Sequence, residues 1–183
     1  MAGLLKAIEG YKGHPQTRAF LSLAPLLFTR TGELLSAQWA EFDLAGRTWA
    51  FEPSKGGSPM VTPLPSQAVE ILRELHSLTG PTGPVFLSPN GTGKPLSNTA
   101  VNNALRVLGY TVTIHGFRAT ARTLLVERLD FRTEVVEMQL GHAVRDPLGR
   151  AYNRTTFLDQ RREMLQAWAD YLDGLRAGGD AAS

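Results

Sequence analysis

The chain has no cysteine among its 183 residues, and this absence excludes disulfide scaffolds, thiolate zinc sites and cysteine nucleophiles. Long apolar runs are also missing: residues 1–12 do not resemble a signal peptide, and nowhere do about 18 uncharged apolar residues stand together. We therefore expect a cytoplasmic protein without a membrane partner.

Lysine is scarce, with 4 Lys against 15 Arg. Arginine suits two-point contact with phosphate, so the bias favours an anionic partner, although a GC-rich genome would produce the same bias.

Alternating apolar and polar residues predict a small antiparallel sheet in this chain. The alternation runs over 42–44 and again over 48–52, on either side of a break at Ala45–Gly46, which is typical of a β-hairpin. A third strand is expected over 60–64, after a tight turn. A further short strand is expected at 85–87, within a connection rich in glycine and proline.

Most of the remaining chain shows the 3.6-residue apolar period of helices. Helices are expected in the first 40 residues, from Ser66, after Ser97 as an N-cap, over 116–127 and 134–140, and after a capping box at 156–159. The last of them carries an apolar stripe through Leu165, Trp168 and Leu172. With 43% hydrophobic residues the chain can fill one core. The predicted fold class is α+β, mainly α, in one domain.

Two charged segments are candidates for an anion site. In His115-Gly-Phe-Arg118, at a helix start, the histidine and the arginine are three residues apart. Side chains at this spacing share a helix face, so we expect an imidazole and a guanidinium on one exposed face. Upstream, Arg30 follows an apolar helix and precedes another, and Glu33 is its expected ion-pair partner. Alone, each feature also fits a structural or solvated role.

Three further residues become candidate site residues when their order along the chain is considered. Lys55 lies on the expected strand turn and is followed by two glycines. Leu140-Gly141-His142 precedes a polar loop that contains Tyr152. A lysine in a turn is usually solvated, and a tyrosine in a loop usually packs its ring. Along the whole chain, however, the order is Arg, Lys on a turn, His-x-x-Arg, Gly-His and Tyr.

In this order and at these intervals the sequence resembles the tyrosine recombinases of the phage-integrase type. The resemblance spans about residues 3–173 and is carried by APLLFTRTGELLSAQWAEFDL, TIHGFRATARTLLVERL, LGHAVRDPLGRAYNR and MLQAWADYL. It implies a helical catalytic domain with a three-stranded antiparallel sheet. It also implies cleavage and rejoining of double-stranded DNA through a 3′-phosphotyrosyl intermediate, without a metal ion or another cofactor.

The resemblance implies a role in this reaction for each candidate side chain. They are the nucleophile, Tyr152; a proton-transfer residue, His115; two arginines that bind the non-bridging phosphate oxygens, Arg30 and Arg118; the proton donor to the leaving 5′-oxygen, Lys55; a residue that donates to the phosphate or packs beside it, His142; and a support for the first arginine, Glu33. Covalent catalysis of this kind divides one difficult exchange into two easier ones.

The resemblance also predicts domain organisation and assembly. Residues 1–178 are expected to form the catalytic domain and 179–183 a disordered tail, while the N-terminal arm-binding and core-binding domains of full-length integrases are absent. We expect a monomer off DNA, and on nucleoid DNA a tetramer in which the C-terminal helix packs onto a neighbouring subunit. Two alternatives stay open: a DNA-binding fragment that keeps the fold without efficient turnover, and a type IB topoisomerase-like enzyme.

Overall fold

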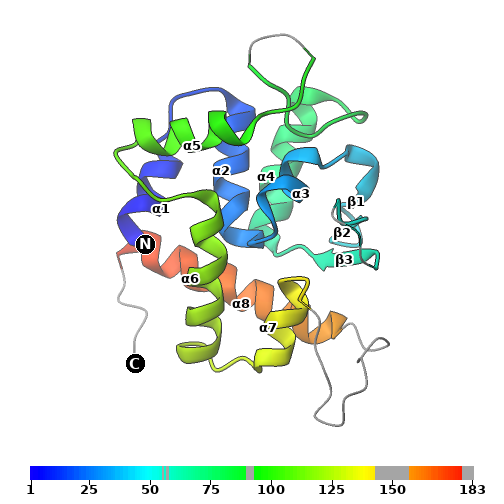
Figure 1. Cartoon of the computed structure of the whole chain (residues 1–183), viewed down its shortest axis with the longest axis vertical. Helices are drawn as coiled ribbons and strands as arrows, with labels where there is room; N and C mark the ends of the chain where they lie inside the picture. Colours follow the sequence, from blue (N-terminus) through cyan, green and yellow to red (C-terminus); the bar gives the residue numbers. More distant parts are fainter. Residues whose placement is uncertain (55, 57, 90–92, 143–156, 179–183) are drawn as a thin grey trace.

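A computed structural model of the chain describes residues 1–54, 56, 58–89, 93–142 and 157–178. It confirms the predicted class, because the chain is mostly helical and has one small antiparallel sheet at its edge (Figure 1). The helices are α1 (Ala2–Glu9), α2 (Pro15–Leu27), α3 (Thr31–Ser36), the 3₁₀ turn η1 (Trp39–Glu41), α4 (Ser66–Thr79), α5 (Asn98–Val107), α6 (Ile114–Glu127), α7 (Thr133–Gln139) and α8 (Leu158–Ala177). Lys55, Tyr152 and the predicted tail 179–183 lie outside the described residues.

The sheet forms where the alternation predicted it. Strands β1 (Phe42–Asp43), β2 (Thr48–Phe51) and β3 (Met60–Pro63) pair antiparallel in the order β1-β2-β3. In the register, Phe42 lies opposite Trp49 and Phe51 opposite Met60. Trp49 is fully buried and stacks on Phe51 at a ring-centroid distance of 4.2 Å, which gives the sheet one apolar face.

The strand predicted at 85–87 does not form. The segment makes only isolated bridges, from Pro84 to Gln38 and from Leu87 to Pro95. Val85 and Phe86 are fully buried, which explains the apolar signal, but their hydrogen bonds go to two different segments. Because the bridge residues Pro84 and Pro95 have no N–H group, a continuous ladder cannot develop.

Helix α2 is the central helix of the domain, and α1, α4, α6 and α8 pack against it. Its apolar residues face all directions, as in a helix that is enclosed on every side. Pro25 lies inside the helix, and its carbonyl accepts a hydrogen bond from the indole Nε1 of Trp168 at 2.8 Å. Phe28, in the left-handed conformation with φ 37°, ends the helix.

Helix α8 packs on its own domain. The predicted apolar stripe of Leu165, Trp168 and Leu172 is fully buried within this chain. Thr156, the first residue of the predicted capping box, lies outside the described residues, and α8 begins directly after Phe157. No helix in the described part of the chain is long and apolar enough to cross a membrane.

Candidate active site

Arg118 lies inside the protein rather than on the exposed face that its spacing from His115 predicted. Its exposed fraction is 6%, whereas His115, in the first turn of the same helix α6, is exposed. The Arg118 guanidinium donates from Nη1 to the carbonyl of Phe28 and from Nη2 to the carbonyl of Leu140, both at 2.9 Å. These two hydrogen bonds hold the side chain against the core and fix the plane of its guanidinium.

Both carbonyls that anchor Arg118 lie at helix C-termini. Phe28 ends α2 and Leu140 ends α7, where carbonyl groups lack partners within the helix and the helix dipole is negative. This arrangement favours a buried cation. Burial nevertheless lowers the pKa of Arg118, and the nearby Arg30 lowers it further, while Glu137 and Glu33 act in the opposite direction. The site therefore holds the positive charges of Arg118 and Arg30 close together, with Arg118 shielded from solvent.

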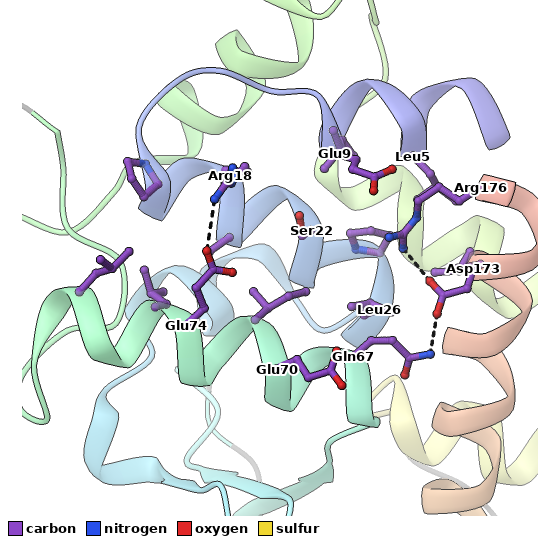
Figure 2. A pocket seen from close by; sticks show the side chains of 18 residues that line it. Leu5, Glu9, Arg18, Ser22, Leu26, Gln67, Glu70, Glu74, Asp173 and Arg176 are labelled. Atoms are coloured by element: carbon purple, nitrogen blue, oxygen red, sulfur yellow. Dashed lines mark hydrogen bonds and ion pairs between the residues drawn. The ribbon is translucent and has the colours of Figure 1, made fainter.

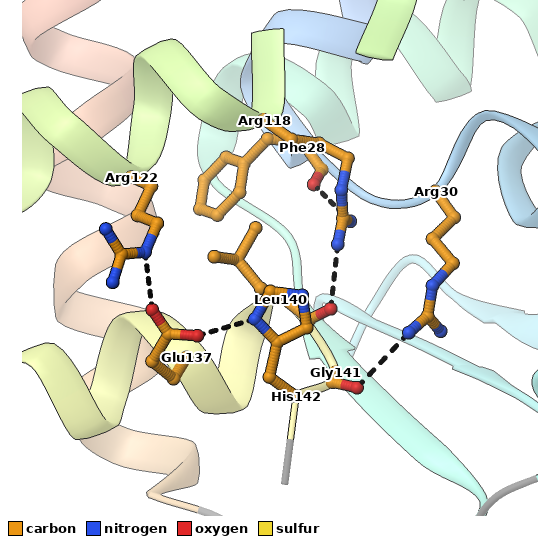
Figure 3. A network of polar contacts seen from close by, with 8 residues as sticks. All are labelled: Phe28, Arg30, Arg118, Arg122, Glu137, Leu140, Gly141 and His142. Carbon is orange, nitrogen blue, oxygen red and sulfur yellow. Dashed lines mark hydrogen bonds and ion pairs between the residues drawn. The ribbon is translucent and has the colours of Figure 1, made fainter. Parts of the chain in front are cut away.

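The Leu-Gly-His segment ends α7 in a Schellman turn. The His142 N–H donates to the Glu137 carbonyl and the Gly141 N–H donates to the Met138 carbonyl, each at 3.0 Å. Gly141 occupies the left-handed region with φ 66°, which explains why glycine stands there. The turn directs the Gly141 carbonyl toward Arg30, whose Nη2 donates to it at 3.4 Å (Figure 3).

The two arginines consequently meet at consecutive carbonyl groups, although they come from distant segments. Arg30, which is half-buried, and Arg118 line one recess together with Thr29 and Met60. Its volume is about 10 Å³, enough for roughly one water molecule. A phosphate does not fit in this recess and would contact the outer side of these arginines.

Glu33 supports the strand turn rather than pairing with Arg30. Its carboxylate, only 4% exposed, accepts hydrogen bonds from the Ser54 backbone N–H at 3.2 and 3.3 Å and from the Ser54 hydroxyl at 3.3 Å. The expected ion pair between Arg30 and Glu33 is not formed, because this carboxylate lies against the β2–β3 turn. Since Ser54 directly precedes Lys55 in the sequence, Glu33 anchors the segment that leads to that lysine.

Two charged residues that the sequence analysis missed complete the network in Figure 3. Glu137 of α7 accepts from Arg122 Nε of α6 at 2.5 Å, and its other oxygen lies 2.5 Å from the His142 Nδ1. Burial alone would raise the pKa of Glu137, but the hydrogen bonds from His142 and Arg122 more than offset it, so the pKa is lowered. One signal was available: Arg122 follows Arg118 by four residues, the spacing that places both on one helix face.

A hollow elsewhere in the molecule contains none of the predicted site residues. It measures about 450 Å³ and lies between α1, α2, α4 and α8 (Figure 2). Apolar side chains such as Leu5, Leu26 and Leu75 line it, and charged pairs such as Arg18 with Glu74, 3.5 Å apart, border it. We name this hollow the α1–α4 groove.

The fold is that of the catalytic domain of tyrosine recombinases. It is similar to the fold of a solved integrase from mycobacterium phage Brujita, which superposes with a TM-score of 0.68 at 22% identity over 89% of this chain and 55% of that one. The family model described as "Phage integrase family" matches residues 1–158. The chain belongs to the phage integrase family, as its resemblance predicted.

Sequence relatives agree with this membership. The protein IntB of Escherichia coli (strain K12) is 37% identical over 189 residues, which cover 93% of this chain and 48% of IntB. The integrase of Enterobacteria phage P4 is 36% identical over 188 residues, which cover 92% of this chain and 43% of that integrase. The chain thus spans about half the length of these curated relatives, or somewhat less.

Proposed function

We propose that residues 1–178 are the catalytic domain of a site-specific recombinase that cuts and rejoins double-stranded DNA through a covalent bond to Tyr152. The observation that best supports this proposal is the meeting of Arg30 and Arg118 at the Gly141 and Leu140 carbonyls, directly before His142. Two adjacent cations repel each other in the free protein. An anion that binds against both relieves this repulsion, so the arrangement favours a phosphate ligand.

In the proposed reaction the Tyr152 phenol oxygen attacks a backbone phosphorus of one strand. An oxygen–phosphorus bond forms, the bond from phosphorus to the 5′-oxygen breaks, the phenol proton passes to His115, and Lys55 protonates the leaving oxygen. A free phenol has a pKa of about 10, so the nucleophile needs this assistance at neutral pH. Attack by a 5′-hydroxyl reverses the step, and because the phosphodiester is exchanged rather than hydrolysed, no nucleotide cofactor is required.

The remaining side chains would stabilise the pentacoordinate phosphate. Arg30 and Arg118 bind its non-bridging oxygens, and the two carbonyl contacts of Arg118 orient it before the substrate arrives. His142 donates to the same phosphate. Glu33 acts indirectly, by holding Ser54 and with it the turn that leads to Lys55.

The proposed substrate places the protein in the cytoplasm on nucleoid DNA, where we expect it to assemble as a tetramer. Since Trp168 and its neighbours in the stripe are buried in cis, a contact in trans would use the chain beyond Ala177 rather than the stripe. Sedimentation on DNA should show tetramers for the full chain and smaller species when 178–183 are deleted, and equal assembly by both would contradict docking of this segment.

The decisive test is covalent capture of DNA. The chain is incubated with a pool of nicked duplexes that carry a randomised centre, and DNA that stays attached after treatment with detergent is recovered and enriched. We expect an adduct that the Tyr152→Phe variant does not form. Tyr171→Phe, which removes a hydroxyl from a ring that stacks on Trp168, is the matched control and should form the adduct.

Two results would overturn the proposed recombinase in favour of the alternatives. Salt-sensitive DNA binding without any adduct would identify a DNA-binding fragment that keeps the fold without turnover. An adduct accompanied by plasmid relaxation, but by no exchange between two enriched duplexes, would identify a type IB topoisomerase-like activity. Strand exchange between the duplexes supports recombination.

A further inference from the structure

Glu137 holds His142 by two separate contacts. The carboxylate of Glu137 lies 2.5 Å from the ring Nδ1, and the Glu137 carbonyl accepts from the His142 backbone N–H at 3.0 Å. The histidine is thus attached to the same residue through its ring and through its main chain. Although 48% of its side chain is exposed, the direction of the ring is set by the end of α7.

A third side chain keeps the carboxylate in place. Arg122 reaches from α6 and donates Nε to the Glu137 oxygen that His142 does not contact (Figure 3). Only 20% of the Glu137 side chain is exposed, against 52% of Arg122. Each carboxylate oxygen therefore has its own partner, so rotation of the Glu137 carboxylate would break one of the two contacts.

The contact determines which ring nitrogen of His142 carries a proton. An ionised carboxylate only accepts hydrogen bonds, so the Nδ1 atom must carry the hydrogen. The lowered pKa of Glu137 agrees with an ionised carboxylate at neutral pH. The Nε2 atom is then the one ring nitrogen left for a ligand: it donates when the ring is protonated and accepts when the ring is neutral.

We propose that Glu137 is a positioning residue of this site, which fixes the ring direction of His142 and keeps a proton on Nδ1. The Nε2 atom is thereby presented to the scissile phosphate, to which it donates when the ring is protonated, and Arg122 holds the carboxylate. The backbone supports this placement, because the carbonyls of Leu140 and Gly141, the two residues before His142, contact Arg118 and Arg30. The inference rests on the proposed function, since it assumes that His142 faces the phosphate that these arginines bind.

The tautomer can be measured without DNA. Nitrogen-15 spectra of histidine-labelled protein are recorded through a pH series until the ring is neutral, and His142 is assigned among the four histidines by its absence from His142→Asn. We expect the proton on Nδ1 in the wild type and a redistribution between both nitrogens in Glu137→Gln. Glu134→Gln, on the same helix, is the matched control and should leave the signal unchanged. Identical spectra for the wild type and Glu137→Gln would overturn the proposal.

A double-mutant comparison separates positioning from a purely structural role. With an enriched nicked duplex, Glu137→Gln should slow adduct formation about tenfold. Losses of about this size are typical when a residue that orients a functional histidine is replaced. In a His142→Ala background the same change should have an effect below about twofold, because there is no ring left to position. An equal loss in both backgrounds would mean that Glu137 acts only on stability, and the proposal would be wrong.

These measurements distinguish failure of the inference from failure of the proposed function. If the wild type forms no adduct while the tautomer depends on Glu137, the recombinase assignment fails, and with it the proposed link between His142 and a phosphate. If the wild type forms an adduct at the same rate as Glu137→Gln, only the inference fails. Should Glu137→Gln not fold, Arg122→Gln releases one oxygen of the carboxylate and allows the same comparison.

Discussion

Replacing Gly141 by alanine tests the backbone geometry of the site without removing any of its charged side chains. With φ at 66°, an alanine here adopts a left-handed conformation at a cost of about 1–2 kcal/mol. The added Cβ would lie 3.7 Å from Arg30 Nη1 and from Met60 Sδ, which are ordinary contacts, so backbone strain is the main effect. For a chain of this size about 1 kcal/mol corresponds to a decrease of roughly 2–4 °C in Tm.

A glycine remote from the site provides the matched control for this experiment. Gly178 ends α8 with φ 88°, and a Cβ there would lie 3.7 Å from Lys6 Nζ. Both alanine variants should lose similar stability in thermal unfolding. Only Gly141→Ala should also slow adduct formation, by about tenfold or more, because a small displacement of the carbonyl that Arg30 contacts misaligns the phosphate site. Equal adduct rates for the two variants would refute the positioning role of this turn.

Three further predictions concern buried or ionised groups. Glu33→Gln should slow adduct formation more than Ser54→Ala does, because the carboxylate accepts from both the N–H and the hydroxyl of Ser54, and equal rates would exclude the anchoring role. Arg161, whose pKa burial lowers to about 10, donates twice to Gln139 Oε1, so Arg161→Met should lower the free energy of unfolding in urea by about 2 kcal/mol. Glu137 has a folded-state pKa below its ordinary 4.5, so the unfolded state binds more protons in that range and the contribution of this residue is lost as the pH falls. The stability difference between wild type and Glu137→Gln should therefore be present at pH 7 and shrink as the pH falls below 4.5.

The fold could be predicted wherever local periodicity and packing agree. The alternation around Trp49 predicted the hairpin because that residue and Phe51 face the core on one side of the sheet. Ser97 could be recognised as an N-cap, and its hydroxyl accepts the Ala100 N–H at 3.1 Å. At 85–87 the apolar signal reflected burial alone, since the pairing that defines a strand depends on segments elsewhere in the chain.

The candidate site was predicted as a set of residues but not as a geometry. The spacing of Arg118 three residues after an exposed histidine predicts a surface residue. The sequence does not reveal that Arg118 donates hydrogen bonds to the carbonyl groups of Phe28 and Leu140. The partner of Glu33 could not be predicted for a similar reason: it is the backbone of Ser54, and a main-chain N–H carries no sequence signal. Contacts to the backbone are thus one part of this site that sequence alone does not specify.

Those backbone contacts also explain why an arginine rather than a lysine stands at position 118. The two carbonyl groups belong to the ends of different helices, and the planar guanidinium reaches both from separate nitrogens while keeping further N–H groups for a ligand. A lysine ammonium is a single point charge, so Arg118→Lys would leave at least one buried carbonyl poorly paired and lose the fixed plane. The ends of α2 and α7 therefore have two effects on Arg118. They exclude water from the guanidinium, which lowers its pKa, and their carbonyl groups hold the guanidinium in a fixed orientation for a phosphate.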